Sequence, residues 1–209
     1  MTRKREDAMT ATAEDIRRWI LTFTDKVIDA EDQLTELDRL AGDGDFGWNV
    51  SSALRRARPH VEAATAGPAD ILAPVTDAFL AAGGTSGALF GLWFGSLAAT
   101  NAPVWPVGDL ADAVLSATDA VRRLGGADVG DRTMVDAMVP AGTALEAAAP
   151  HGWDAALSAA ATAAHDGAES TRGLVARRGR ASYVGKKANG VTDPGALTIA
   201  WFFAAGERR

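Results

Sequence analysis

Three carboxylates lie within eight positions of the segment LDRLAGDGDFGWN, and they are the residues whose types and spacing most clearly suggest chemistry. Asp43 and Asp45 are separated only by a glycine, and Asp38 lies five positions before Asp43. Like charges this close repel one another, so a compensating cation is expected. Carboxylate oxygens bind Mg²⁺, which typically takes one or two of them together with substrate phosphates. The segment predicts a magnesium site that presents phosphates, with a solvated turn of helix-capping aspartates as the alternative.

Other readings of the same segment fail on context. Gly42, Gly44 and Gly47 match the spacing GxGxxG, but a helix and not a strand is expected before them, so the dinucleotide-binding fingerprint lacks its required setting. A calcium loop of the EF-hand type beginning at Asp43 would need an acidic residue at its twelfth position, which is Leu54. The sequence GxxxxGK[ST] is absent from the chain, which excludes a P-loop.

A second glycine-rich segment, AAGGTSGALFG, places Thr85 and Ser86 at the start of an apolar helix. Backbone N–H groups at a helix start, together with the helix dipole, bind phosphate readily. The same residues also suit a helix stop followed by an N-cap. This segment is therefore a candidate phosphate site only in combination with the others.

Two further loops combine charged residues with glycine. The loop GGADVGDRTM ends at Met134, whose flexible thioether could pack on an adenine ring or belong to the core, and Asp136 could be either a surface or a site residue. The loop GRASYVGKKANGVTDPGA brings Arg178 and Arg180 close in sequence to Asp193 and also contains Lys186 and Lys187. In an acidic protein such a cluster is a plausible phosphate clamp, because Arg offers bidentate contacts, and a basic surface loop is the alternative.

Helices are expected to carry all four loops. Alanine is abundant, and apolar residues recur at intervals of three and four, which predicts an all-α fold. We expect one domain over residues 13–209 after a flexible N-terminus, residues 1–12. Its helices are expected as a long one and then a short one within 13–40, followed by 48–64, 69–82, one from 85, one from Asp109 as its cap to about 124, 134–148, 153–175 and 195–206.

Composition narrows the class of protein. The net charge of −6 argues against a nucleic-acid or anionic-membrane partner, because both require a basic face. Cysteine is absent, which excludes disulfides, thiolate metal sites and a cysteine nucleophile. The longest apolar run, PGALTIAWFFAAG, is shorter than a membrane span. We expect a soluble cytoplasmic protein.

Taken in order, GDGDFGWN, GGTSGALFG, GDRTMVDAM and GRASYVGKKANGVTDPGA resemble the four signature segments of the nucleotide-binding L subunit of the dihydroxyacetone kinase family. The resemblance implies an antiparallel eight-helix barrel that holds ADP or ATP at one end through two Mg²⁺ ions. It assigns metal ligation to Asp38, Asp43 and Asp45, and catalytic roles to these aspartates and Arg180. The nucleotide contacts that it implies are Phe46, Gly47, Asn49, Thr85, Ser86, Gly126, Met134, Arg180, Asp193 and Gly195.

The same resemblance implies the partners. A separate K-type subunit would bind the small ketose, a triose or tetrose, and ATP or a phosphocarrier protein would supply the phosphoryl group; a homodimer is left open. The chain departs from the family at Phe46, where His is common, and in the stretch from Lys186 to Asn189. Two other hypotheses share parts of this pattern: a nucleotide-loaded regulator that docks on a transcription factor or kinase, and a helical scaffold without ligand.

Overall fold

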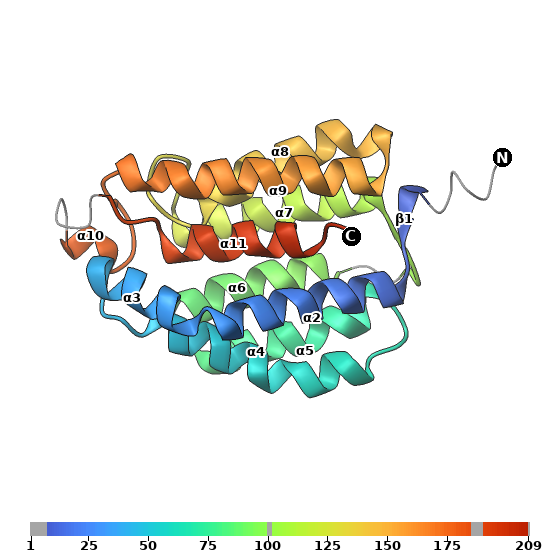
Figure 1. The fold of residues 1–209 in the computed structure, drawn as a ribbon, viewed down its shortest axis with the longest axis horizontal. Coiled ribbons are helices and arrows are strands. Elements are labelled where there is room, and N and C mark those ends of the chain that lie inside the picture. The colour runs from blue at the N-terminus through green and yellow to red at the C-terminus, as the bar shows by residue number, and fades with distance from the viewer. Residues whose placement is uncertain (1–7, 100–101, 185–189, 209) are drawn as a thin grey trace.

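Helices make up most of the chain (Figure 1), as the alanine-rich, helix-period sequence predicts. The computed structural model describes residues 8–99, 102–184 and 190–208. The elements are β1 (Thr10–Ala11), α2 (Ala13–Asp29), α3 (Glu31–Ala41), α4 (Phe46–Ala63), α5 (Pro68–Ala82), α6 (Gly84–Leu97), β2 (Trp105–Pro106), α7 (Val107–Gly125), α8 (Val135–Ala148), η1 (Ala149–His151), α9 (Trp153–Ser170), η2 (Thr171–Gly173), α10 (Ala181–Val184) and α11 (Pro194–Ala205).

The long helices form a closed ring. Each packs against the next in the order α2, α4, α5, α6, α7, α8, α9 and α11, and α11 packs back against α2. The chain reverses direction at each connection, so neighbouring helices are antiparallel. The predicted all-α fold and its antiparallel barrel of eight helices are confirmed, with α3 and α10 as additional short helices at one end of the barrel (Figure 1).

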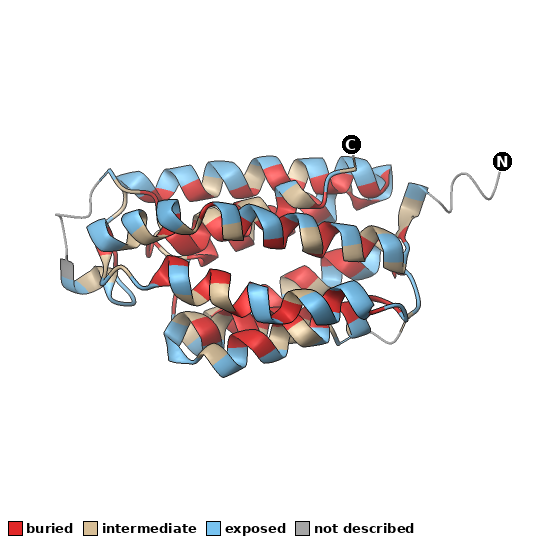
Figure 2. Ribbon diagram, turned by 60° about the horizontal axis from the view of Figure 1, so that its bottom comes forward, coloured by how far each residue is buried: buried red, intermediate tan, exposed pale blue. Residues whose placement is uncertain are grey.

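The core lies inside this ring. Buried residues face inward on the barrel helices and exposed residues face outward (Figure 2), which is the pattern that a stripe of apolar residues with helical spacing produces. Aromatic rings from α2, α6 and α11 meet at the centre, where Phe94 lies 5.6 Å from Phe202 and 6.1 Å from Phe23, centroid to centroid. Trp19 donates a hydrogen bond from Nε1 to the carbonyl of Phe202 at 2.6 Å. This contact joins α2 to α11 and so closes the ring.

Two predicted helix boundaries are wrong for identifiable reasons. Pro106 and not Asp109 is the N-cap of α7, because its extended backbone leads directly into a helix that starts at Val107. Helix α9 ends at Ser170 and not near residue 175, and the next three residues form the 3-10 turn η2. There the hydroxyl of Thr171 accepts a hydrogen bond from the backbone N–H of Asp193 at 2.8 Å, which fixes the start of α11.

The end of the barrel away from α3 and α10 holds both ends of the described chain. Strand β1 pairs antiparallel with β2, with Thr10 opposite Pro106. Arg208 donates to the carbonyl of Thr10 at 2.7 Å. Residues 10–11 thus have a defined place within the segment 1–12, whereas residues 1–7 lie outside the described residues. In the described part of the chain, no helix combines the length and the apolar character needed to cross a membrane.

Candidate functional site

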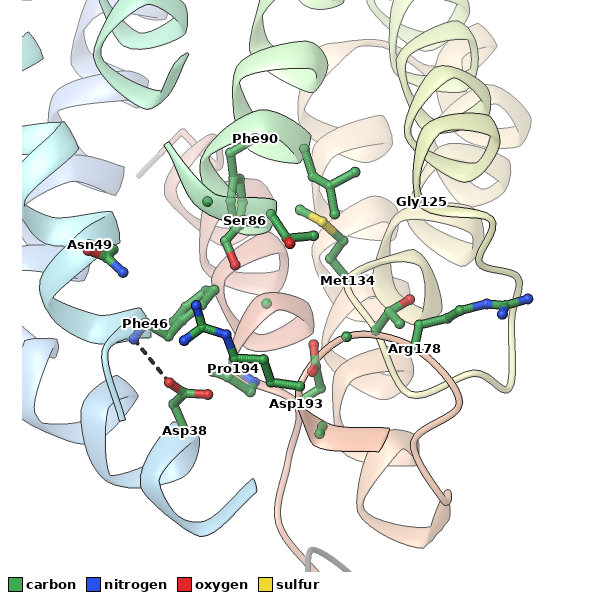
Figure 3. A pocket seen from close by; sticks show the side chains of 18 of the residues that line it. Asp38, Phe46, Asn49, Ser86, Phe90, Gly125, Met134, Arg178, Asp193 and Pro194 are labelled. Atoms are coloured by element: carbon green, nitrogen blue, oxygen red, sulfur yellow. Dashed lines mark hydrogen bonds between the residues drawn. The ribbon is translucent and has the colours of Figure 1, made fainter. Parts of the chain in front are cut away.

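A pocket of about 210 Å³ lies at the barrel end that carries α3 and α10 (Figure 3). Helices α4, α6, α8 and α11 all begin at its wall, where Phe46, Gly84, Val135 and Pro194 line it. The first N–H groups of a helix have no partner within the helix, and the dipole adds partial positive charge there. Because the ring alternates in direction, it brings four such ends together, an arrangement that favours an anionic ligand.

The three aspartates meet at this pocket. Each of Asp38, Asp43 and Asp45 offers a carboxylate oxygen, and these oxygens lie within 4.8 Å of one another. Asp38 belongs to the last turn of α3 and accepts hydrogen bonds from the N–H groups of Gly44 at 2.9 Å and Phe46 at 3.1 Å. Its carboxylate therefore shapes the loop as well as facing the pocket. The other two carboxylates are more exposed.

A cation already lies among these carboxylates. The guanidinium of Arg180 forms ion pairs with Asp43 and with Asp45, the latter at 3.2 Å. Three clustered carboxylates supply the hard oxygen donors that Mg²⁺ prefers, and the guanidinium shows that the cluster accommodates positive charge. The residues present therefore fit a divalent metal ion.

The hydroxyl and amide side chains predicted to contact phosphate line the same pocket. Thr85 and Ser86 come from the first turn of α6, and Asn49 comes from the first turn of α4 (Figure 3). Gly83 and Gly84 precede them with φ of 70° and 68°, a backbone region that side chains other than glycine rarely adopt. The loop can therefore present its backbone N–H groups toward the aspartates.

The pocket wall away from the aspartates is apolar. Met134, predicted from its loop, lines it, and so do residues that the sequence did not single out. The latter are Leu89, Phe90, Val121, Ala127 and Val135. All but Ala127 lie in helices at the spacing of core residues, so no signal in the sequence separates these from the core. An apolar slot beside a group of helix N-termini suits a flat heterocyclic base.

A buried aspartate and a buried arginine hold the loop that precedes α8. Asp136 is buried and accepts from the N–H groups of Gly130 at 2.6 Å and Thr133 at 2.8 Å. The sequence left it open between surface and site, and the structure gives it a supporting role inside the loop. Arg132 has φ of 61°, unusual for a residue with a side chain, and donates to the carbonyl of Val191 at 2.8 Å. This bond ties the loop to the segment before α11.

Asp193 lies at the bottom of the pocket as the N-cap of α11. Its carboxylate accepts from the N–H of Ala196 at 2.8 Å. Burial raises the pKa of Asp193 to about 7, although the Ala196 N–H and the charge of Arg132 act in the opposite direction. Gly195, two positions after Asp193, also lines the pocket. This part of the pocket therefore changes its charge near neutral pH.

Two predicted contact residues do not line the pocket. Gly47 is buried where α4 crosses α3, and a Cβ atom there would lie 2.3 Å from Oγ1 of Thr35 and 2.4 Å from the carbonyl of Glu31. Gly126 is the left-handed C-cap of α7, with φ of 57°, between two residues that do line the pocket, Gly125 and Ala127. Both glycines have structural reasons to be glycine, and their contacts with a nucleotide stay predictions.

The basic loop is only partly described. Arg178, Gly179 and Arg180 line the pocket, but the side chain of Arg178 extends away from the other labelled residues (Figure 3), with its Nε 3.7 Å from the carboxylate of Asp131. Lys186, Lys187 and Asn189, in the stretch expected to depart from the family pattern, lie outside the described residues. Phe46, the other departure, is buried and packs against Phe90 with ring centroids 6.3 Å apart.

Comparison with known proteins gives consistent matches. The L-erythrulose 1-kinase of Mycolicibacterium smegmatis is 40% identical over 92% of this chain and 35% of its own length, and the triokinase/FMN cyclase of Homo sapiens is 36% identical over 81% and 30%. The chain thus spans about a third of these relatives. It is 32% identical to the ADP-binding subunit DhaL of the PEP-dependent dihydroxyacetone kinase of Escherichia coli, over 91% of this chain and 94% of that subunit.

Solved structures agree with these matches. The dihydroxyacetone kinase from C. freundii in complex with AMP-PNP and Mg²⁺ superposes with a TM-score of 0.67 and 30% identity, over 93% of this chain and 33% of that one. The family model described as "DAK2 domain" matches residues 40–207, which include most of the barrel and every wall of the pocket except Asp38. This chain therefore belongs to the DAK2 domain family, together with the ADP-binding L subunits of dihydroxyacetone kinases.

Proposed function

We propose that this chain binds ADP or ATP with two Mg²⁺ ions and supplies a phosphoryl group to a small ketose held by a separate K-type subunit or domain. The observation that carries the proposal is the combination in one pocket of an aspartate cluster, four helix N-termini and an apolar slot. A metal–phosphate group fits the first two, and a purine base fits the third.

The residues of the pocket divide the work by chemistry. Asp38, Asp43 and Asp45 would hold the metal, which, when bound, offsets the charge on the phosphates during transfer. The N–H and hydroxyl groups of Thr85 and Ser86 would hold phosphate oxygens, as expected for the start of a helix. Catalysis by this chain is then positioning and charge stabilisation, and it needs no covalent intermediate on the protein.

An apolar rim around the pocket supports a partner that covers it. Of the exposed large hydrophobic side chains in the described part of the chain, all but Val104 lie at this end of the barrel. The apolar rim consists of Leu40, Trp48, Leu80, Leu124, Val129, Val175 and Tyr183. Grouped exposed apolar side chains mark interaction surfaces, and a partner seated here would exclude water from the phosphoryl group. The proposed ketose-bearing partner docks on this rim.

Nucleotide binding is the first test. Isothermal titration of the wild-type protein with ADP should give Mg²⁺-dependent binding, and Asp43→Ala should weaken it at least about tenfold, since one charged hydrogen-bonding or metal-ligating group is worth about 1.5–3 kcal/mol. Asp112→Ala, which removes the same charge from an exposed position of α7, is the matched control. No binding by the wild type, or equal binding by the two variants, would reject the proposal.

Transfer is the second test. The protein, a K-type protein and either dihydroxyacetone or erythrulose are combined with ATP, or with a phosphocarrier protein and catalytic ADP. Formation of the ketose phosphate identifies both substrate and donor. Binding of Mg-nucleotide without transfer to any ketose would leave the regulatory hypothesis in its place. The relatives reported above all carry names of kinases or kinase subunits, which favours transfer.

A further inference from the structure

We propose that Arg180 is a latch that a divalent metal ion displaces: its guanidinium holds the strap, residues 174–184, against Asp43 and Asp45, and metal binding at these carboxylates releases the strap. The proposal rests on the metal site of the proposed function and adds a regulation of access to it.

The strap crosses the mouth of the pocket and is attached on two sides. In its first half, the N–H of Arg177 donates to the carbonyl of Asp131 at 3.1 Å, and the Arg177 side chain lies 3.5 Å from the Asp131 carboxylate. In its second half, Gly179, Arg180 and Ala181 line the pocket, and Arg180 reaches the aspartate loop before α4. The hydrogen bonds from the N–H groups of Ser182 and Tyr183 run to Gly179 and Arg180, within the strap itself. Among the described residues, Arg180 is therefore the side chain that holds the second half across the mouth.

The guanidinium and a metal ion compete for the same oxygens. Arg180 contacts one carboxylate oxygen of Asp43 and one of Asp45, the two residues that share the acidic cluster with Asp38. A second positive charge at that position would be repelled by the guanidinium, and a metal ion would draw on the same two carboxylates for its ligands. A metal ion at Asp43 and Asp45 and the Arg180 guanidinium therefore compete for the same carboxylates.

The strength of the contact suits a reversible latch. The side chain of Arg180 is 60% exposed, and those of Asp43 and Asp45 are 42% and 52% exposed. Exposed ion pairs contribute only about 0.2–1 kcal/mol each, which biases the strap without blocking a divalent ion. Once released, the guanidinium still lies on the strap beside the pocket, where it can bind phosphate oxygens in the bidentate manner that Arg favours. Metal alone should loosen the strap, and metal with nucleotide should fix it again.

Hydrogen exchange in the strap tests this order of events. In the wild type, amide exchange in residues 174–184 should quicken when saturating Mn²⁺ is added alone and slow when ADP is added as well. In Arg180→Ala, exchange should be fast from the start and insensitive to Mn²⁺ alone. Electron paramagnetic resonance should show that this variant binds Mn²⁺ about two- to thirtyfold more tightly than the wild type, the factor that corresponds to the loss of two exposed ion pairs.

Arg177→Ala is the matched control, because it removes the same charge from the same strap without touching the aspartate cluster. Its affinity for Mn²⁺ should equal that of the wild type, and Arg180→Lys should lie between wild type and Arg180→Ala. Equal Mn²⁺ affinities of Arg180→Ala and Arg177→Ala, or a wild-type strap that Mn²⁺ does not loosen, would overturn the latch. If the latch is overturned but the wild type still binds Mg-ADP, the proposed function stands. If the wild type binds neither Mn²⁺ nor Mg-ADP, both the latch and the proposed function are rejected.

Discussion

Single residues of the pocket can hold the fold together and also face the proposed ligand, and Asp38 is the clearest case. Its carboxylate accepts two backbone N–H groups of the aspartate loop and also belongs to the acidic cluster. Removing the side chain of such a residue is expected to change both the stability of the fold and the binding of the ligand. Asn at the same position separates the two roles, because its amide oxygen can accept the same N–H groups without the negative charge.

We expect Asp38→Asn to melt close to the wild type and yet to lose affinity for Mg-ADP. Asp38→Ala should lose both, with a cost in unfolding free energy of about 1–3 kcal/mol for the unsatisfied loop N–H groups. Thermal unfolding without ligand and titration with Mg-ADP measure the two effects separately. Equal melting temperatures for the Asn and Ala variants would show that the loop does not depend on this carboxylate.

Asp193 predicts a pH dependence of stability. Its pKa is about 7 in the folded chain, against an ordinary value of 3.8, so between these values the folded state holds the proton more tightly than the unfolded state. The stability that protonated Asp193 gives the folded state is fully present below about pH 4 and is lost as the pH rises toward 7. In urea unfolding without ligand, Asp193→Asn should therefore gain stability relative to the wild type as pH rises from 5 to 8, while its cap to Ala196 is kept.

Asp70 predicts a pH dependence of opposite sign, in the acidic range below the window of that measurement. The N–H groups of Ala66 and Thr65 lower the pKa of Asp70, so its contribution is present at neutral pH and is lost as pH falls through the lowered value. Asp70→Asn should lose stability relative to the wild type as pH rises through the acidic range. A flat difference between the wild type and Asp193→Asn across pH 5–8 would contradict the account of Asp193.

Among single residues, the sequence predicts those whose charge differs from the type of residue around them. Asp43, Asp45 and Arg180 are charged residues in glycine-rich loops, and the structure brings them together. Phe90 and Val121 could not be predicted, since an apolar residue that lines a pocket has the same helical spacing as one in the core. The pKa of Asp193 could not be predicted either, because burial depends on residues from other helices.

Among the elements, the crossing of α3 and α4 decides where the aspartate loop lies. Gly47 lets the first turn of α4 approach the backbone of α3 so closely that a Cβ atom would lie 2.4 Å from the carbonyl of Glu31. Asp38 is on one of these helices, and Asp45 is the N-cap of the other. Any separation of the two helices therefore moves the two carboxylates apart.

Gly47→Ala should lower the unfolding free energy by about 1–3 kcal/mol, the usual range for overpacking, and should also weaken Mg-ADP binding. Gly108→Ala is the control, because a Cβ atom at that position in the first turn of α7 would have no neighbour within 4 Å. It should be neutral or slightly stabilising, since Ala favours a helix over Gly. Chemical denaturation of the two variants side by side makes the comparison, and equal stabilities would refute the close-packing argument.

Helix positions were predictable from periodicity, whereas several ends were not. The break between α2 and α3 was expected from the interrupted apolar stripe, and it falls at Ala30. Asp109 looked like an N-cap because Asp commonly is one, but Pro106 starts the helix earlier with its fixed φ. The end of α9 depends on the bond between Thr171 and Asp193, two residues far apart in the sequence. Ends of this kind are determined by tertiary contacts.

For the whole molecule, the pocket joins helices that are far apart in the sequence, five of them from the closed ring. Its walls come from α3, α4, α6, α7, α8 and α11 and from the loops between them. A ligand that binds there connects segments that are adjacent only in the folded barrel. Closure of the ring by α2 and α11 was implied by family resemblance, because local sequence patterns do not specify contacts between the first and last helices.

Mg-ADP should therefore stabilise the entire barrel in a single transition. At a free concentration of one hundred times its dissociation constant, a ligand adds about 2.7 kcal/mol, which for a chain of this size corresponds to a rise in Tm of roughly 5–10 °C. Calorimetry with and without Mg-ADP measures the shift, and Asp43→Ala serves as the variant that should not respond. A shift confined to a minor transition would mean that the barrel does not unfold as one unit.

The two ends of the described chain constrain how this barrel can be linked to another domain. Residue 10 and residue 208 are held together at the end opposite the pocket. Helix α2 has 17 residues, so a tether from either end must cover about 25 Å to reach the mouth. An extended residue spans about 3.3 Å, so a linker shorter than roughly eight residues could not bring a fused domain to its own barrel's pocket. With such a short linker, the fused domain could reach only the pocket of a second copy of the protein. A longer tether would raise the effective concentration of the domain at the pocket of its own barrel.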